Sequence, residues 1–222
     1  MIDQTSWLDA REREDQRTLC PLCGSSNAPL TLRAPRLDQL SDLPYSHLEY
    51  ADCTMVFLDS AVELAPSNCD ESGYYSPRAA LLRGWVRPVM GAFNRLRLWM
   101  VERVWQAEPG RLLDVGCGKG RFLAAARAAG WEVVGLEPTE RSWRVAVEEF
   151  ELDVIPELFR DDHFPDDHFD VVTMWHTLEH IPDPVQVVQA ICDWLVPGVM
   201  VVIAVPNYDS FQARLGRDLW FQ

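Results

Sequence analysis

The chain has 222 residues, 48% of them hydrophobic and 24% charged, which suits one main globular domain with a small accessory domain. With 34 acidic and 20 basic residues its formal net charge is −14, which argues against general binding to nucleic acids or to anionic membranes. The first residues lack the pattern of a signal peptide, and no apolar run approaches the ~18 residues of a transmembrane helix, so the expected compartment is the cytoplasm.

Residues 1–76 form the first predicted domain, an irregular segment with short strand-like runs. Within it, Cys20-Pro-Leu-Cys23-Gly has the spacing of a zinc knuckle, in which two thiolates flank a tight turn. A four-cysteine ribbon needs a second pair. In a cytosolic chain, cysteines are expected to be free thiols or metal ligands rather than disulfides. The six cysteines stand at positions 20, 23, 53, 69, 117 and 192.

Residues 77–110 form the second predicted segment, because apolar side chains recur there at helical spacing. Pro88 and Gly91 interrupt the pattern, so we expect either two helices or one kinked helix. The dipeptide Pro109-Gly110 ends the segment.

From Arg111 to Gln222, strand-like and helix-like segments alternate, which predicts a parallel sheet covered by helices on both faces. Gly130 is expected to end the first helix, and Thr139 is expected to cap the second. Asp183, followed by proline, is expected to cap a third helix. The expected strands are 111–115, 132–137, 153–155, 169–174 and 199–205, and the expected helices are 120–129, 139–150 and 183 to about 197.

The first strand and helix of this region are joined by the sequence Leu-Leu-Asp114-Val-Gly116-Cys-Gly118-Lys-Gly120. A buried strand that ends in a carboxylate and a glycine-rich turn is typical of a nucleotide-type cofactor site, because glycines let the backbone approach a ligand and the helix start offers N–H groups. The glycine pattern alone fits several dinucleotide folds. Glu137 narrows the choice, because an acid at the end of the next strand can accept both hydroxyls of a ribose.

The motifs resemble those of class I S-adenosylmethionine-dependent methyltransferases over about residues 111–207. Such proteins have a Rossmann-like, doubly wound, mostly parallel sheet, and the resemblance implies methyl transfer to a small-molecule acceptor, with a hydroxyl group as the expected target. The motifs that carry the resemblance are the glycine loop 112–120, Val134-Gly-Leu-Glu-Pro138, Phe164 to Val172, Leu178-Glu-His-Ile-Pro-Asp-Pro184 and Leu195-Val-Pro-Gly198.

The resemblance also implies roles for individual residues. Asp114 would lie near the ammonium group of the cofactor, and Glu137 would bind its ribose. Alternatively, Asp114 braces the loop, Glu137 is an ordinary surface acid and Trp175 is a packing residue. The other residues implied to contact the cofactor are Gly116, Cys117 and Gly118 at its amino-acid end, Pro138, Glu157 and Leu158 around its adenine, and Trp175 and His176 near its sulfonium.

His176-Thr-Leu-Glu179-His180 has the spacing of an inverted zinc-protease motif, but it follows a buried strand and Ile181-Pro ends any helix at once, so zinc proteolysis is not expected. His176 or His180 could instead act as a general base for a substrate hydroxyl. Alternatively, Glu179 and His180 only hydrogen-bond the loop. Some relatives of the quinone pathway are known for a divalent ion near this segment.

The run around Cys53 resembles the second cysteine knuckle that precedes some methyltransferases of this type, with Tyr50 in place of the first cysteine. Zinc at Cys20, Cys23 and Cys53 would then need a fourth ligand, for which His47 and Cys69 are candidates. The alternative is a ribbon-like remnant that is held together by packing. The helical segment 77–110 is similar to the part of these enzymes that forms a substrate lid.

The chain also departs from the family pattern, because the complete fold has two more strands than residues 111–222 supply. We therefore expect an incomplete domain with an uncovered sheet edge and possible self-association. Two further functions stay open: a non-catalytic cofactor-binding or interaction module inactivated by truncation, and binding to a macromolecule through the zinc ribbon.

Overall fold

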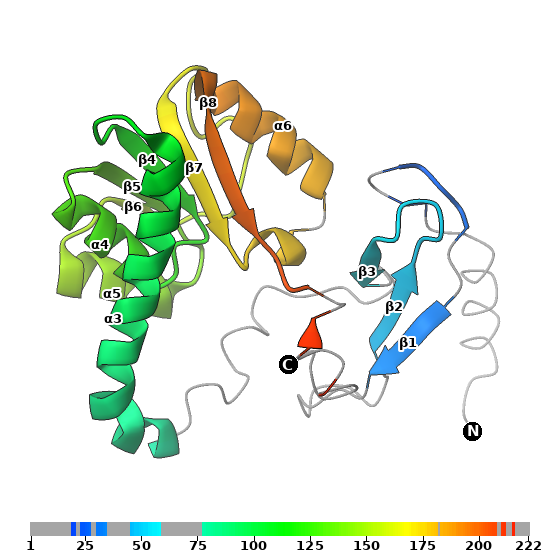
Figure 1. Cartoon of the computed structure of the whole chain (residues 1–222), viewed down its shortest axis with the longest axis horizontal. Helices are drawn as coiled ribbons and strands as arrows, with labels where there is room; N and C mark the ends of the chain where they lie inside the picture. The colour runs from blue at the N-terminus through cyan, green and yellow to red at the C-terminus, as the bar shows by residue number, and fades with distance from the viewer. Residues whose placement is uncertain are drawn as a thin grey trace, which may run out of the picture. The chain divides into compact units, whose positions relative to one another are not determined.

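The structure is a computed structural model that describes residues 19–20, 23–27, 30–34, 45–58, 77–181, 183–207, 210–211 and 215. The chain divides into two compact units, one of Met1–Pro66 with Asn207–Gln222 and one of Ser67–Pro206 (Figure 1). The domain limits predicted from the sequence, at residues 76 and 110, stay predictions.

The first unit contains a three-stranded antiparallel sheet. Its strands are β1 (Leu30–Ala34), β2 (Tyr45–Glu49) and β3 (Val56–Leu58), in the order β1-β2-β3. Because Glu49 pairs with Val56, the turn between β2 and β3 is short, and Cys53 lies in it. The strand pairing thus fixes the backbone on both sides of this cysteine.

The second unit is an α/β fold around a five-stranded parallel sheet in the order β6-β5-β4-β7-β8. The Rossmann-like parallel sheet expected from the sequence is confirmed. The elements are α3 (Pro77–Trp105), β4 (Arg111–Val115), α4 (Arg121–Ala128), β5 (Glu132–Leu136), α5 (Glu140–Phe150), β6 (Val154–Ile155), β7 (Phe169–Trp175), a 3₁₀ turn η1 (Leu178–His180), α6 (Pro184–Trp194) and β8 (Leu195–Ala204).

Two hydrophobic cores lie on the two faces of this sheet, because successive strand residues point to opposite sides. Leu112 of β4 and Val171 of β7 belong to the core that includes residues of α3, α4 and α5. Their neighbours Leu113 and Val172 belong to the core beneath α6. Figure 1 shows α4 and α5 on one side of the sheet and α6 on the other. Along β4 and β7, side chains therefore alternate between the face covered by α3 and the face covered by α6.

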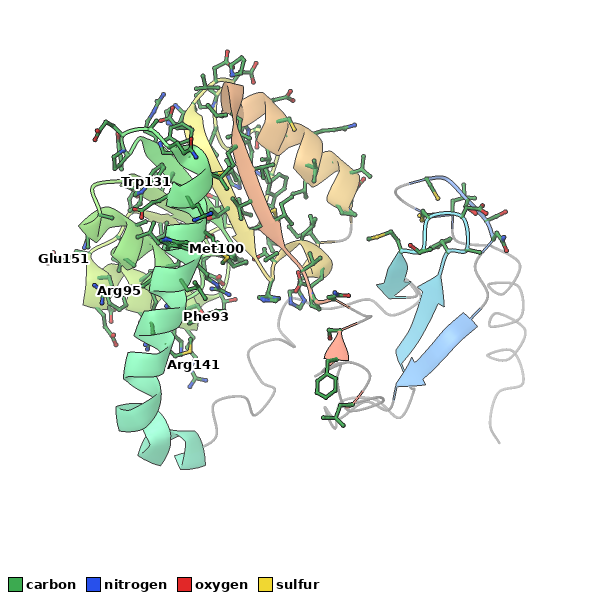
Figure 2. All side chains as sticks on the ribbon, in the orientation of Figure 1. Phe93, Arg95, Met100, Trp131, Arg141 and Glu151 are labelled. Carbon is green, nitrogen blue, oxygen red and sulfur yellow. The ribbon has the colours of Figure 1, made fainter. Side chains whose placement is uncertain are left out.

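The helix α3 is continuous from Pro77 to Trp105, so of the two expected alternatives the division into two helices is wrong and a single helix remains. A proline removes a single i→i−4 hydrogen bond, and good helix formers on both sides carry the helix through Pro88 and Gly91. The end of α3 is held by Trp105, whose ring lies 5.8 Å from that of Trp131 (labelled in Figure 2) and whose indole N–H donates to the Glu108 carbonyl (2.8 Å).

The boundary between α6 and β8 also differs from the expectation. The helix begins as predicted, because the Asp183 side chain accepts a hydrogen bond from the Gln186 amide (3.0 Å). It ends at Trp194, before Pro197 and Gly198, which lie inside β8. The pairing of β8 with β7 is irregular at this point, and a bulge on an edge strand tolerates both residue types.

Within the described part of the chain, β8 forms one edge of the sheet, and Val201 on it is 37% exposed. No helix among the described residues combines the length and the apolar character that crossing a lipid bilayer requires.

Candidate functional site

The carboxyl ends of β4 and β5 form the centre of the candidate site. These strands are adjacent and parallel, with Val115 beside Leu136, so the residues that follow each strand meet at the same edge. The amides of Gly116 and Cys117 both donate to the Leu136 carbonyl, at 2.7 and 3.2 Å. The glycine loop is therefore fastened to the end of β5, next to Glu137.

Glu137 is only 7% exposed, and its carboxylate holds two backbone segments together. One oxygen accepts a hydrogen bond from the Gly118 amide, and the other accepts one from the Thr139 amide, both at 2.9 Å. Thr139 precedes α5 as predicted, although its side chain makes no capping hydrogen bond. Because each carboxylate oxygen has a second lone pair, Glu137 can still accept hydrogen bonds from a diol.

The glycine loop depends on backbone conformations that favour glycine. Gly116, Gly118 and Gly120 have φ angles of 75°, 53° and 69°. A Cβ on Gly118 would meet no atom within 4 Å, so this residue faces open space. The amides of Gly116, Cys117, Gly118 and Gly120 all donate within the protein, so the loop offers fewer free N–H groups than its sequence suggests.

Asp114 is 2% exposed and lies on the α3 face of the sheet, since Leu112 of the same strand belongs to that core. Its carboxylate accepts a hydrogen bond from the Thr173 hydroxyl (2.7 Å). Burial raises the pKa of Asp114 to about 7; the Thr173 hydrogen bond and the charge of Arg97 lower it, and the charge of Glu137 raises it further. A buried carboxyl with a specific charged neighbour, beside a glycine loop, makes Asp114 a candidate functional residue.

Sequence reasoning missed Arg97, which lies on α3 within electrostatic range of Asp114. Its guanidinium carbon lies 4.8 Å from the centre of the Trp175 ring and 4.4 Å from that of Phe93. Burial lowers the pKa of Arg97 and Asp114 raises it. Two buried donors here, Arg97 Nε and Trp175 Nε1, have no hydrogen-bond partner among the described residues. The sequence carried one signal: Arg97 follows Phe93 by four residues, so that on a helix the two side chains share a face.

Trp175 also packs in the core, because its ring meets that of Phe122 edge to face at 5.5 Å. The packing interpretation therefore has direct support, while its unpaired indole N–H leaves a ligand contact open. Cys117 is buried and burial raises the pKa of its thiol, so the side chain is neutral there.

The residues expected around an adenine lie after β5 and β6, at the same edge of the sheet. Pro138 is exposed and follows Glu137 directly. Glu157 forms an exposed ion pair with Arg160 (3.2 Å), and Leu158 is 58% exposed. The structure brings these residues to the expected edge, and their role in binding stays a prediction.

His176 and His180 follow β7 and are both exposed. His176 has a φ of 58°, which a non-glycine residue rarely adopts, and its Nδ1 lies 3.5 Å from a carboxylate oxygen of Glu179. His180 ends the single turn η1. Only this short turn is helical, so the helix face that an inverted zinc-protease motif requires does not form.

A second cluster of chemically active groups lies in the first unit. The sulfurs of Cys20, Cys23 and Cys53 all lie within 4.8 Å of one another. The pKa of Cys53 is raised to about 11: a hydrogen bond from the backbone of Met55 lowers it, and desolvation and the sulfurs of Cys23 and Cys20 more than offset that effect. His47 lies in β2, and Cys69 lies outside the described residues.

Comparison with known proteins adds to this geometry. Residues 92–222 match the model of a family described as a methyltransferase domain. The ubiquinone biosynthesis O-methyltransferase of Bordetella avium (strain 197N) is 33% identical over 126 residues, which cover 52% of this chain and 51% of that protein. The protein of the same name from Thiobacillus denitrificans (strain ATCC 25259 / T1) is 35% identical over 123 residues, covering 53% of each. This chain therefore spans about half the length of the curated relatives it matches.

A solved structure, that of the plantazolicin methyltransferase BpumL in complex with SAH, matches with a TM-score of 0.50 at 15% identity. The match covers 66% of this chain and 62% of that one. At this level of identity the likeness bears on the fold alone.

Proposed function

The chain belongs to the methyltransferase domain family, and from that premise we propose that it transfers a methyl group from S-adenosylmethionine to a hydroxyl group of a small-molecule acceptor. The observation that carries the proposal is a pair of buried carboxylates, Asp114 and Glu137, at the ends of adjacent strands and on either side of a glycine loop. When bound, the cofactor supplies a methyl group that its sulfonium already activates.

The charges of the site match the functional groups of this cofactor. Glu137 has free lone pairs for the two ribose hydroxyls. Asp114 offers a buried negative charge to the ammonium group. Arg97 Nε and Trp175 Nε1 supply unpaired donors for the carboxylate, and Gly118 leaves room for the ligand beside the loop.

We assign the residues around the adenine and the acceptor from their places in the fold. Pro138, Glu157 and Leu158 lie at the edge of the sheet beyond Glu137, and we assign them to the adenine. The likeness to relatives named O-methyltransferases supports a hydroxyl acceptor. Such an acceptor gives up a proton on methylation, and His176, with Glu179 near its ring, is the candidate base.

Cofactor binding is tested by titration calorimetry of the whole chain with S-adenosylhomocysteine. We expect Glu137→Gln to weaken binding by about tenfold, because the charged acceptor of two hydroxyl groups is lost. Glu132 is the matched control: it begins the same strand, at the opposite edge of the sheet, and it is exposed, so Glu132→Gln should bind like wild type. A folded wild-type chain that binds no ligand, or equal affinities in both variants, would contradict the proposal.

The role of His176 is tested by following the formation of S-adenosylhomocysteine with a panel of hydroxyl-bearing small molecules. We expect His176→Gln to lower kcat by about tenfold, at the low end for a general base, because water reaches this half-exposed ring and can take the proton instead. Ligand affinity should not change. An unaltered kcat removes His176 from the mechanism and directs the same measurement to His180→Gln, while cofactor binding without turnover on any acceptor supports a non-catalytic module.

A further inference from the structure

Two loops of the N-terminal unit share one pattern of backbone hydrogen bonds. In the loop that begins at Cys20 and in the loop that begins at Tyr50, the first residue's amide donates to the carbonyl five residues later, at 2.8 and 2.9 Å. The amides of Gly24 and Thr54 donate back to the carbonyls of these first residues, at 2.9 and 2.7 Å. The pattern pairs Cys20 with Tyr50, Cys23 with Cys53, Gly24 with Thr54 and Ser25 with Met55.

Thr54 in the second loop has a backbone conformation that is unfavourable for its side chain. Its φ is 59°, close to the 70° of Gly24 in the first loop. A β-branched residue in this left-handed region costs roughly 1–2 kcal/mol, which glycine does not incur. The surrounding contacts must therefore impose the loop conformation, although the glycine that favours it is missing.

The two loops are also tied directly to each other. The Ala51 amide donates to the Asn27 carbonyl (3.0 Å), and the Ser25 hydroxyl donates to the carboxylate of Asp52 (2.5 Å). These bonds join the segment after the first cysteine pair to the turn that carries Cys53. The two loops that carry the thiols are thus held together by bonds in which no thiol takes part.

The sulfurs lie at the separations that a single metal ion requires. The sulfurs of Cys20 and Cys53 are 3.5 Å apart, and all three lie within 4.8 Å of one another. Thiolates bound tetrahedrally to Zn²⁺ at ~2.3 Å lie about 3.8 Å apart. Three soft sulfur ligands in this arrangement select Zn²⁺ among the abundant divalent ions, since Mg²⁺ and Ca²⁺ prefer oxygen.

We propose that Cys20, Cys23 and Cys53 bind one Zn²⁺ as three thiolates, and that the fourth coordination position is open to an exchangeable ligand because Tyr50 stands where a four-cysteine site would carry its fourth sulfur. Tyr50 is 1% exposed, whereas Cys23 is exposed, so the metal is reached from the solvent side of the cluster. Each thiol that binds releases its proton to solvent.

The first test is the metal content of the whole chain. After reduction and exposure to Zn²⁺, elemental analysis should find one zinc per chain, and binding should release protons to the buffer. Replacement by Co²⁺ should give the sulfur-to-metal charge-transfer bands of a thiolate site. A fully reduced chain that takes up no metal overturns the proposal. So does a chain whose Cys20 and Cys53 form a disulfide instead of binding metal.

Substitutions of single cysteines and of Tyr50 then test which side chains bind the metal and how many do so. Cys23→Ser, at an exposed position, should weaken zinc binding by at least about tenfold. Tyr50→Cys should strengthen it and raise the charge-transfer intensity of the Co²⁺ form in the ratio of about 4 to 3. Cys192→Ser is the matched control, since this exposed cysteine lies on α6, and it should bind zinc like wild type. Equal affinities in Cys23→Ser and Cys192→Ser overturn the assignment of ligands, even if Tyr50→Cys fails to fold.

The open position is tested separately with a small thiol as a probe. Added 2-mercaptoethanol should shift the Co²⁺ spectrum of wild type toward that of a four-thiolate site and leave Tyr50→Cys unchanged. A wild-type spectrum that does not respond means that another protein group saturates the metal, which overturns the open position. The residues that we propose for binding S-adenosylhomocysteine all lie in the other unit, so failure here is distinguishable from failure of the proposed function.

Discussion

Replacing Asp114 with asparagine is expected to weaken the binding of S-adenosylhomocysteine by about 100-fold, because the ligand's ammonium group loses a charged partner in a buried site. The pH profile separates this role from a purely structural one. Since the pKa of Asp114 is about 7 in the free protein, binding must displace a proton at lower pH. We expect the wild-type affinity to rise with pH up to about 7 and then to level off, and the affinity of Asp114→Asn to depend little on pH over this range.

The same substitution should stabilise the ligand-free protein. The folded-state pKa of about 7 lies above the ordinary value of 3.8, so the folded chain binds the additional proton between these values. The contribution of this group to stability is therefore fully present below about pH 4 and is lost as the pH rises through 7. At pH 8 we expect Asp114→Asn to unfold at a higher denaturant concentration than wild type, although it binds the ligand less well.

Calorimetry and chemical denaturation over pH 5.5–8.5 measure both effects, with Asp153→Asn as the control. Asp153 precedes β6 and is exposed, so its loss should change neither profile. A wild-type affinity that does not vary with pH, or an Asp114→Asn variant that binds like wild type, would exclude a charged contact between Asp114 and the ligand.

Gly120→Ala is expected to lower the free energy of unfolding by roughly 2–5 kcal/mol, a large part of the stability of an ordinary domain. Gly120 has a φ of 69° directly before α4, which disfavours any side chain. In addition, a Cβ here would lie 2.8 Å from that of Ala146 and would overlap the side chain of Leu152. The helix α5 and the residues after it would have to move away from the loop.

Gly118→Ala is the matched comparison in the same loop. Its φ of 53° imposes a similar backbone cost of about 1 kcal/mol, but the Cβ meets nothing within 4 Å. This variant should lose only this backbone cost of about 1 kcal/mol in stability, and it should lose ligand affinity because the methyl group enters the space beside the loop. Denaturation followed by tryptophan fluorescence measures the difference, and equal stabilities of the two variants would contradict the packing argument.

The order of strands and helices in residues 111–205 was predictable because local chemistry agrees with the fold. Asp183 before Pro184 begins α6 as expected, and buried apolar runs form the parallel strands. The family was predictable from the glycine loop and Glu137, and the match of residues 92–222 confirms it. Each of these signals involves residues that are close together in the chain, so it can be recognised from the sequence alone.

The failures have two causes: the surrounding backbone accommodates a residue that usually ends a helix, or a contact with a distant segment gives a residue its importance. Pro88 does not divide α3, and Pro197 does not end α6, because a longer helix and an irregular edge strand accommodate them. Arg97 was missed because its importance comes from Asp114 and Trp175, which follow it by 17 and 78 residues. The replacement of a cysteine by Tyr50 was visible in the sequence, whereas the hydrogen bonds that give the Tyr50 loop the same pattern as the Cys20 loop are seen only in the folded backbone.

The alternation of side chains along β4 and β7 has a consequence for how this domain can diverge. Asp114, Thr173 and Trp175 all lie on the α3 face, whereas the buried cluster beneath α6, among the described residues, is built from side chains such as Leu113 and Val172. Volume-conserving exchanges beneath α6 leave every polar contact of the ligand site in place, so natural variation can accumulate there without altering chemistry. Substitutions on the α3 face of the sheet, in contrast, change the charges and polar groups around Asp114. Selection for a new acceptor would therefore act on α3 and the strand ends. Substitutions in the core beneath α6 would accumulate without an effect on the ligand site.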